Sequence, residues 1–93
     1  MNAEPIRTVP FTVPDGRRTL QYTLLSDIPA PGIPGGPLYG IRISLSDDAG
    51  VLLDESEIRG MTPDRSAVLA LLDLLIRNTV TPCTLQDVLE DLL

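Results

Sequence analysis

Alternating apolar and polar positions predict β-strands along most of the N-terminal part of the chain. The pattern is clearest over residues 38–46, where aliphatic and aromatic side chains recur at every second position. This period of two is typical of a strand with one face on a core and the other toward solvent. The alternation predicts four strands, at about residues 7–13, 18–28, 38–46 and 51–59.

Turn-forming residues between these segments predict an antiparallel meander. Pro14-Asp15-Gly16 and Asp47-Asp48-Ala49-Gly50 join neighbouring strands through short turns. Pro10 lacks a backbone N–H donor, which restricts the first strand to an edge of the sheet. Acidic residues in the 51–59 strand discourage the association of one sheet with another. One face of such a sheet must be covered to form a core.

A helical period begins after the last strand and predicts a helix over residues 63–77. Thr62 is expected to cap its N-terminus, with Pro63 at the first helical position, where the missing N–H costs nothing. The apolar positions spread over a wide arc, so this helix must contact more than one neighbour. Asp73 and Arg77, four residues apart, are expected to form an exposed ion pair.

A second helix is predicted over residues 84–92, with Thr84 as its N-cap. Cys83 precedes this cap and Val88 follows it at the spacing of a hydrophobic staple, in which two apolar side chains fix how the chain enters a helix. Carboxylates crowd the last helical turn, where the helix dipole already places negative charge. Packing against the first helix, or contact with another chain, must therefore hold this segment.

Together these elements predict a single α+β domain over residues 1–93. Its architecture is a four-stranded antiparallel β-meander with both C-terminal helices packed on one face. A Pro/Gly-rich loop, residues 29–37, connects the second and third strands and has too few N–H donors for a helix or a central strand. This loop either contacts a ligand or partner, or is an insertion that only connects two strands.

Charge and cysteine content narrow the function classes. The chain carries 7 basic and 13 acidic residues and no His, so its formal net charge is −6 at pH 7. An acidic chain repels nucleic-acid phosphates, which argues against a nucleic-acid partner. The lone Cys83 allows no internal disulfide and no signal peptide is evident, so we expect a cytoplasmic location. The apolar stretch at 67–76 is about half as long as a membrane span.

No catalytic or metal-binding constellation emerges from the sequence. Nucleophilic catalysis through Cys83 would lack an imidazole base, because the chain contains no His. The carboxylates stand at no recognised metal-ligand spacing. The 29–37 loop lacks the Lys and the following helix that phosphate-binding loops require. The sequence therefore predicts no metal and no cofactor, and it favours a protein that is not an enzyme.

The most distinctive sequence lies within residues 60–91, above all in Leu74–Asp91 around Val80-Thr81-Pro82-Cys83-Thr84. The Tyr39–Ile43 strand and the helix start at Thr62–Arg65 belong to the same pattern. These segments resemble a family of short, uncharacterised clostridial (Firmicutes) proteins classed as a domain of unknown function. The resemblance implies a bacterial origin and cytoplasmic solubility, and it transfers no catalytic residue.

Two functions of different classes remain open. The first is a small protein-interaction or regulatory module that contacts a protein partner or a second copy of itself, with a homodimer as the simplest form. Tyr39, Arg42, Asp73 and Arg77 form its candidate interaction surface. The alternative is a small-molecule binding or enzymatic domain with a pocket between Tyr39, Arg42 and the 29–37 loop.

Overall fold

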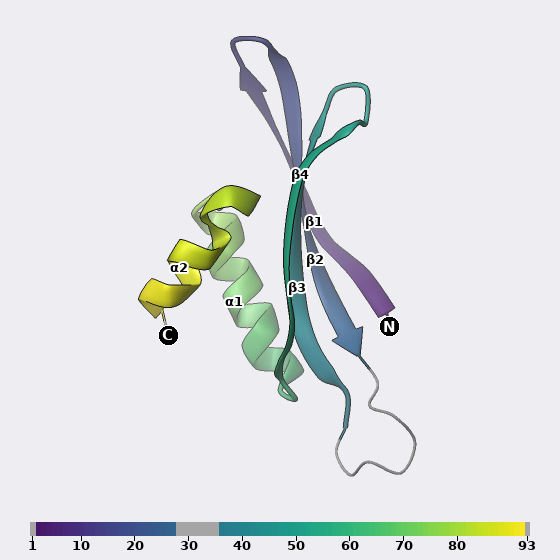
Figure 1. The fold of residues 1–93 in the computed structure, drawn as a ribbon, viewed down its shortest axis with the longest axis vertical. Helices are drawn as coiled ribbons and strands as arrows, with labels where there is room; N and C mark the ends of the chain where they lie inside the picture. The colour runs from purple at the N-terminus through teal and green to yellow at the C-terminus, as the bar shows by residue number, and fades with distance from the viewer. Residues whose placement is uncertain (1, 28–35, 93) are drawn as a thin grey trace.

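Four strands in one antiparallel sheet carry two helices on a single face (Figure 1). The computed structural model describes residues 2–27 and 36–92, without the side chains of residues 2, 86, 91 and 92. The strands follow one another in the sheet as they do along the chain, so the predicted meander and the α+β class are confirmed. They are β1 (Asn2–Val13), β2 (Gly16–Asp27), β3 (Leu38–Asp47) and β4 (Leu52–Thr62).

Three helical segments follow the sheet, namely α1 (Arg65–Arg77), the 3₁₀ turn η1 (Pro82–Thr84) and α2 (Leu85–Leu92). The α1 helix packs against β2 and β3, and η1 packs against β4. Both predicted helices are thus present on one face of the sheet (Figure 1). Of the predicted 29–37 loop, residues 29–35 lie outside the described residues, whereas Gly36 and Pro37 are exposed and have no regular structure.

The outer strands are longer than the alternation predicts. β1 starts at Asn2, and its register against β2 shifts between Pro5 and Arg7. β4 continues to Thr62. Its register against β3 shifts between Tyr39 and Ile41. Such bulges let a strand continue along its neighbour despite residues of low β-propensity. Pro10 lies on edge strand β1, as predicted.

The core lies between the sheet and the helices. Apolar side chains at alternate positions of β2 and β3 meet the inner face of α1 and the segment that follows it. The buried members of this core are Leu20, Tyr22, Leu24, Ile41, Ile43, Val68, Leu72, Leu75, Val80, Leu85 and Leu89. The alternation predicted for β2 and β3 is therefore confirmed on this face.

The opposite face of the sheet is not uniformly polar. Thr23 and Leu25, which alternate with the core positions of β2, are 5% and 0% exposed. Leu25 pairs in register with Ala3 on β1 and with Gly40 on β3, so its cross-strand neighbours are small. β2 is therefore buried on both faces near its C-terminal end, whereas the alternation predicted a strand with only one buried face.

Gly40 allows β4 to approach β3 closely. A Cβ atom at this position would overlap the Ile58 carbonyl oxygen and would lie 2.9 Å from the Arg59 Cα. Only a residue without a side chain fits there. A glycine inside an alternating strand pattern is a sequence signal for such a bulge, and here it marks the point where the β3–β4 register shifts.

The first helix begins two residues later than predicted. Asp64 is its N-cap, and its Oδ1 atom accepts hydrogen bonds from the backbone N–H groups of Ser66 and Ala67 at 3.0 and 3.3 Å. A carboxylate at this position satisfies unpaired donors and also suits the positive end of the helix dipole. The Thr62 hydroxyl instead accepts from the Asp64 N–H, one turn before the helix. Thr62 as N-cap was therefore wrong.

The second helical segment also has a different start from the predicted one. Helical structure begins with η1, whose N-cap position is Thr81 and whose first residue is Pro82. The Thr84 hydroxyl accepts from the Thr81 N–H at 3.3 Å, so Thr84 occupies the third position of this cap and is not itself the N-cap. The preference of Pro for the first helical position, together with the short Thr side chain at the cap, explains the earlier start.

Moving the cap also moves the hydrophobic staple. Cys83 is exposed, and its sulfur lies 3.3 Å from the Thr81 hydroxyl, so it does not form the predicted staple with Val88. With Thr81 at the cap, the staple positions are Val80 and Leu85, and both are buried in the core. Val88 is partly buried and packs at the border of the core.

The α1 helix ends in a Schellman motif. The Thr79 N–H donates to the Ile76 carbonyl and the Val80 N–H donates to the Leu75 carbonyl, both at 3.1 Å. Thr79 adopts a φ of 50°, a left-handed conformation that β-branched residues rarely adopt. The reversal of the chain at this residue directs Val80 into the core and starts the path toward η1 and α2.

Candidate interaction surfaces

Tyr39 and Arg42 lie on opposite faces of the sheet. Tyr39 packs against the core on the helix side, whereas Arg42 pairs on the other side with Glu57 at 3.1 Å and with Glu55 at 3.6 Å. The two residues are three positions apart on one strand, and side chains at such a spacing point in opposite directions. A single pocket lined by Tyr39 and Arg42 is therefore wrong.

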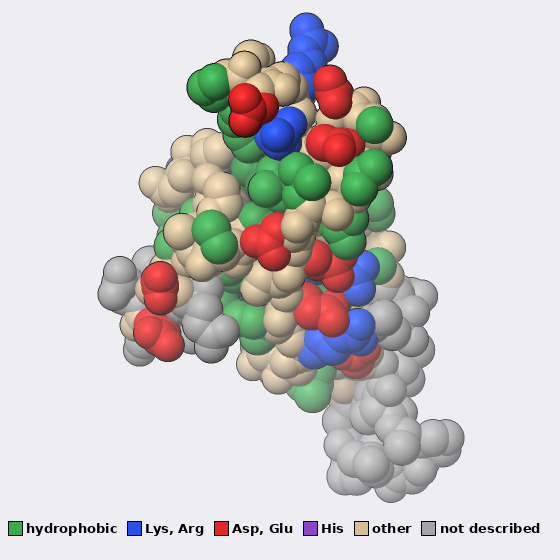
Figure 2. All heavy atoms as spheres, turned by 45° about the horizontal axis from the view of Figure 1, so that its top comes forward, with side chains coloured by type: hydrophobic (Ala, Val, Ile, Leu, Met, Phe, Trp, Pro, Cys, Tyr) green, Lys and Arg blue, Asp and Glu red, His purple; other side chains and the backbone are tan. Residues whose placement is uncertain are grey.

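Arg42 belongs to a ladder of charges across three strands on the open face. Arg59 continues the ladder, because it contacts Glu57 at 3.2 Å and Asp27 at 3.6 Å. Figure 2 shows acidic and basic side chains side by side along one flank of the molecule. Hydrogen bonding from Arg42, supported by Arg59, lowers the pKa of Glu57 from its ordinary value. The ladder neutralises most of its own charge, so it is not an anion-binding cluster of free arginines.

The predicted pair of Asp73 and Arg77 is present on the outer surface of α1. Their side chains meet at 2.9 Å across one helical turn, four positions apart, and they are 58% and 74% exposed. An exposed helical ion pair of this kind stabilises by about 0.3–0.5 kcal/mol. Neither residue lies on the same face of the molecule as the Arg42 ladder, because α1 covers the opposite side of the sheet.

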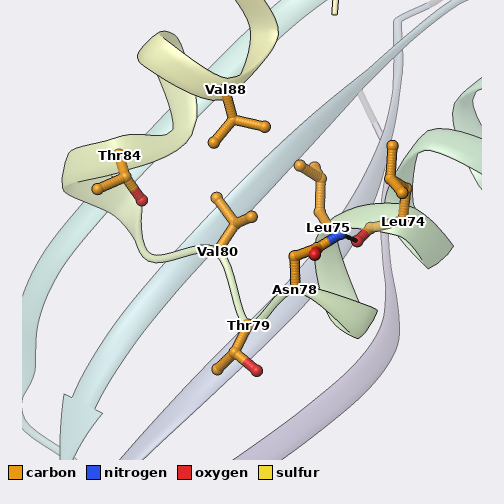
Figure 3. A pocket seen from close by; sticks show the side chains of 7 residues that line it. All are labelled: Leu74, Leu75, Asn78, Thr79, Val80, Thr84 and Val88. Carbon is orange, nitrogen blue, oxygen red and sulfur yellow. Dashed lines mark hydrogen bonds between the residues drawn. The ribbon is translucent and has the colours of Figure 1, made fainter. Parts of the chain in front are cut away.

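A hollow of 380 Å³ lies where α1 ends and α2 begins (Figure 3). Val88 on α2 and Val80 on the connecting segment point toward one another across it. The Asn78 side chain lies at its rim and donates a 2.8 Å hydrogen bond to the Leu74 carbonyl. Its lining residues are Leu74, Leu75, Asn78, Thr79, Val80, Thr84 and Val88. None of these described lining residues is titratable, so they offer apolar contact with a few hydroxyl and amide groups.

A run of exposed aliphatic residues lies at the start of β4. Val51, Leu52 and Leu53 are 56%, 53% and 48% exposed. In Figure 2, hydrophobic side chains lie next to acidic ones toward the end of the molecule that carries both hairpin turns. The sequence predictions missed this surface. Its signal was the apolar run itself, because a period of two cannot bury three consecutive residues on one face.

Among the side chains that the structure describes, no three of His, Cys, Asp or Glu come together in a way that could hold a metal ion. In the same ranges, no single helix has both the length and the apolar character to cross a membrane. The α1 helix and the segment Pro82–Glu90 reach that length and composition only as a pair bent by 117°.

Comparison with known proteins places the chain in a family. No curated protein and no solved structure matches it. The sequence profile of DUF6514, a family of unknown function, matches residues 12–93, which include everything from the end of β1 through both helices. The match covers the segments from Gly60 onward that resembled a family of this kind. The chain therefore belongs to DUF6514, a family of unknown function.

Proposed function

We propose that this chain is a small acidic protein-interaction or regulatory module of a bacterial cytoplasm, acting by contact and not by catalysis. The observation that carries the proposal is the exposed run Val51, Leu52 and Leu53 at the start of edge strand β4. Full burial of one such side chain stabilises by about 1.5–3 kcal/mol. Three of them in a row at the surface favour a site that a partner covers.

Two further properties support this proposal. The formal net charge of −6 disfavours a nucleic-acid partner and favours a protein with a basic surface. The Cys83 thiol is exposed and free, which fits a reducing compartment.

The proposal is tested by affinity capture from a bacterial lysate with three forms of the full chain. These are the wild type, the V51S/L52S/L53S variant and Leu74→Ser, which changes a similarly exposed leucine elsewhere. We expect a partner that the wild type and the Leu74→Ser variant retain and the triple variant loses. A wild type that is strictly monomeric by light scattering and retains nothing specific would overturn the proposal.

Small-molecule binding in the hollow between α1 and α2 is a second candidate function. Its volume of 380 Å³ falls within the range of ligand pockets, and apolar walls with a few polar groups are typical of such sites. A thermal-shift screen tests it, since a ligand at a hundredfold its Kd adds about 2.7 kcal/mol to the free energy of unfolding. Val88→Ser should remove the shift, and V51S/L52S/L53S should keep it.

A further inference from the structure

Strand β4 is one of the two edges of the sheet. It pairs with β3 on one side only, and in the part of the chain that the structure describes no strand lies beyond it. Between its two register shifts it keeps an unbroken pairing with β3 over Asp54–Ile58. An edge strand presents a row of N–H and C=O groups that point away from its sheet, and an extended segment can pair with them.

The other edge of the sheet is protected. β1 contains Pro5 and Pro10, which have no N–H to donate. Prolines on an edge strand interrupt the regular pairing of another strand. A strand added to this sheet would therefore pair with β4.

Charge disfavours a second copy of the chain as the added strand. Asp54, Glu55 and Glu57 are all exposed along β4. Pairing of two β4 strands across a two-fold axis at Ser56 would place Glu55 of one copy opposite Glu57 of the other. Like charges directly opposite one another destabilise a pair of strands.

The same carboxylates favour a basic segment as the strand that pairs with β4. Glu55 and Glu57 are two positions apart and project from the open face, where both contact Arg42. The two arginines of the ladder, Arg42 and Arg59, are outnumbered by its three carboxylates, which are those of Asp27, Glu55 and Glu57. A partner strand with basic residues at alternate positions would therefore meet them, and aliphatic residues at one of its ends would meet the exposed run Val51–Leu53.

We propose that β4 accepts an extended basic segment of a partner protein by strand addition along Asp54–Ile58, with aliphatic residues of that segment covering Val51–Leu53. This inference rests on the proposed interaction function and specifies its partner. The backbone hydrogen bonds would supply affinity, while the alternate basic side chains would supply selection.

The test is a titration of the isotopically labelled full chain with a capped synthetic peptide that alternates arginine and valine and ends in two leucines. We expect saturable binding, with the largest amide shifts and new exchange protection over residues 54–58. The same peptide with glutamate in place of arginine is the charge control. The arginine peptide N-methylated on every residue is the backbone control, and neither control should bind.

Variants of the protein separate charge from fold. The double variant Glu55→Gln/Glu57→Gln should bind the arginine peptide about tenfold more weakly, since two cross-strand charge pairs are lost. Asp73→Asn, on the far side of α1, should bind as the wild type does. Amide shifts that map to α1 and α2, binding that survives N-methylation, or no binding at all would overturn strand addition. The capture experiment with V51S/L52S/L53S would still decide the broader function independently.

Discussion

The Tyr22 hydroxyl donates a 2.9 Å hydrogen bond to the Val80 carbonyl oxygen, across 58 positions of the chain. Tyr22 is fully buried on β2, and Val80 follows the end of α1. The bond satisfies a polar group in the middle of an aliphatic core and ties the end of the helix to the sheet. In the described ranges, no buried side-chain polar atom lacks a hydrogen-bond partner.

Removing this hydroxyl should destabilise the fold. Tyr22→Phe leaves the Val80 carbonyl without its buried donor, and we expect the free energy of unfolding to fall by about 1–3 kcal/mol. Urea unfolding followed by circular dichroism measures the change. Tyr39→Phe is the matched control, because Tyr39 is partly exposed, and it should change stability by less than about 0.5 kcal/mol. Equal effects of the two substitutions would contradict the assigned role.

The same tyrosine predicts a loss of stability at alkaline pH. Burial raises the pKa of Tyr22 above its ordinary value of 10.0. The unfolded chain therefore releases this proton at a lower pH than the folded chain does. The contribution of the protonated Tyr22 to the free energy of unfolding is thus complete below pH 10, and it is lost as pH rises through the raised pKa. The chain has no Lys, which leaves few other groups to titrate there. Melting temperatures measured upward from about pH 9 should fall more steeply for the wild type than for Tyr22→Phe.

The parts of the fold that sequence alone predicts are those set by local periodicity. Strand alternation and short turns gave the meander, because each depends on residues that are neighbours in the chain. The cap positions were wrong because several capping residues stand close together, and backbone geometry selects Asp64 over Thr62 and Thr81 over Thr84. The burial of Leu25 was missed because it depends on small neighbours from β1 and β3.

The candidate surfaces were less predictable than the fold. Tyr39 and Arg42 lie on opposite faces of the sheet because side chains alternate along a strand, and their odd spacing of three positions already predicts this. The hollow in Figure 3 could not, because its walls come from the end of α1, the connecting segment and α2. Its shape depends on the chain reversal at Thr79, and no local pattern specifies that conformation for a threonine.

Gly40→Ala should be strongly destabilising. The added methyl group would overlap the Ile58 carbonyl oxygen. The β3 and β4 backbones are paired with one another, so neither can move away without breaking their register. We expect a loss of about 3 kcal/mol or more in the free energy of unfolding, measured by urea denaturation. Gly36→Ala is the control, because nothing lies within 4 Å of its added Cβ, and it should be close to neutral. A Gly40→Ala variant as stable as this control would contradict the close approach of the strands.

Thr79→Gly should have the opposite effect and stabilise the protein. Thr79 holds a φ of 50° at the position of the Schellman motif that glycine usually occupies. A left-handed conformation costs a residue with a Cβ about 1–2 kcal/mol, and glycine removes this cost. Part of the resulting gain in stability is offset by the greater freedom of glycine in the unfolded chain. The net gain expected in the free energy of unfolding is about 1 kcal/mol, measured by thermal or urea denaturation.

Thr79→Ala separates strain from the loss of the side chain. Alanine keeps the Cβ and the conformational cost but removes the hydroxyl and methyl groups, so it should gain much less than glycine does. Because Thr79 also lines the hollow between α1 and α2, the two variants distinguish packing from ligand binding there. A hollow that holds a ligand through the Thr79 hydroxyl would lose its thermal shift in both variants. A hollow that is only a by-product of the chain reversal would lose nothing, and only the glycine variant would melt at a higher temperature.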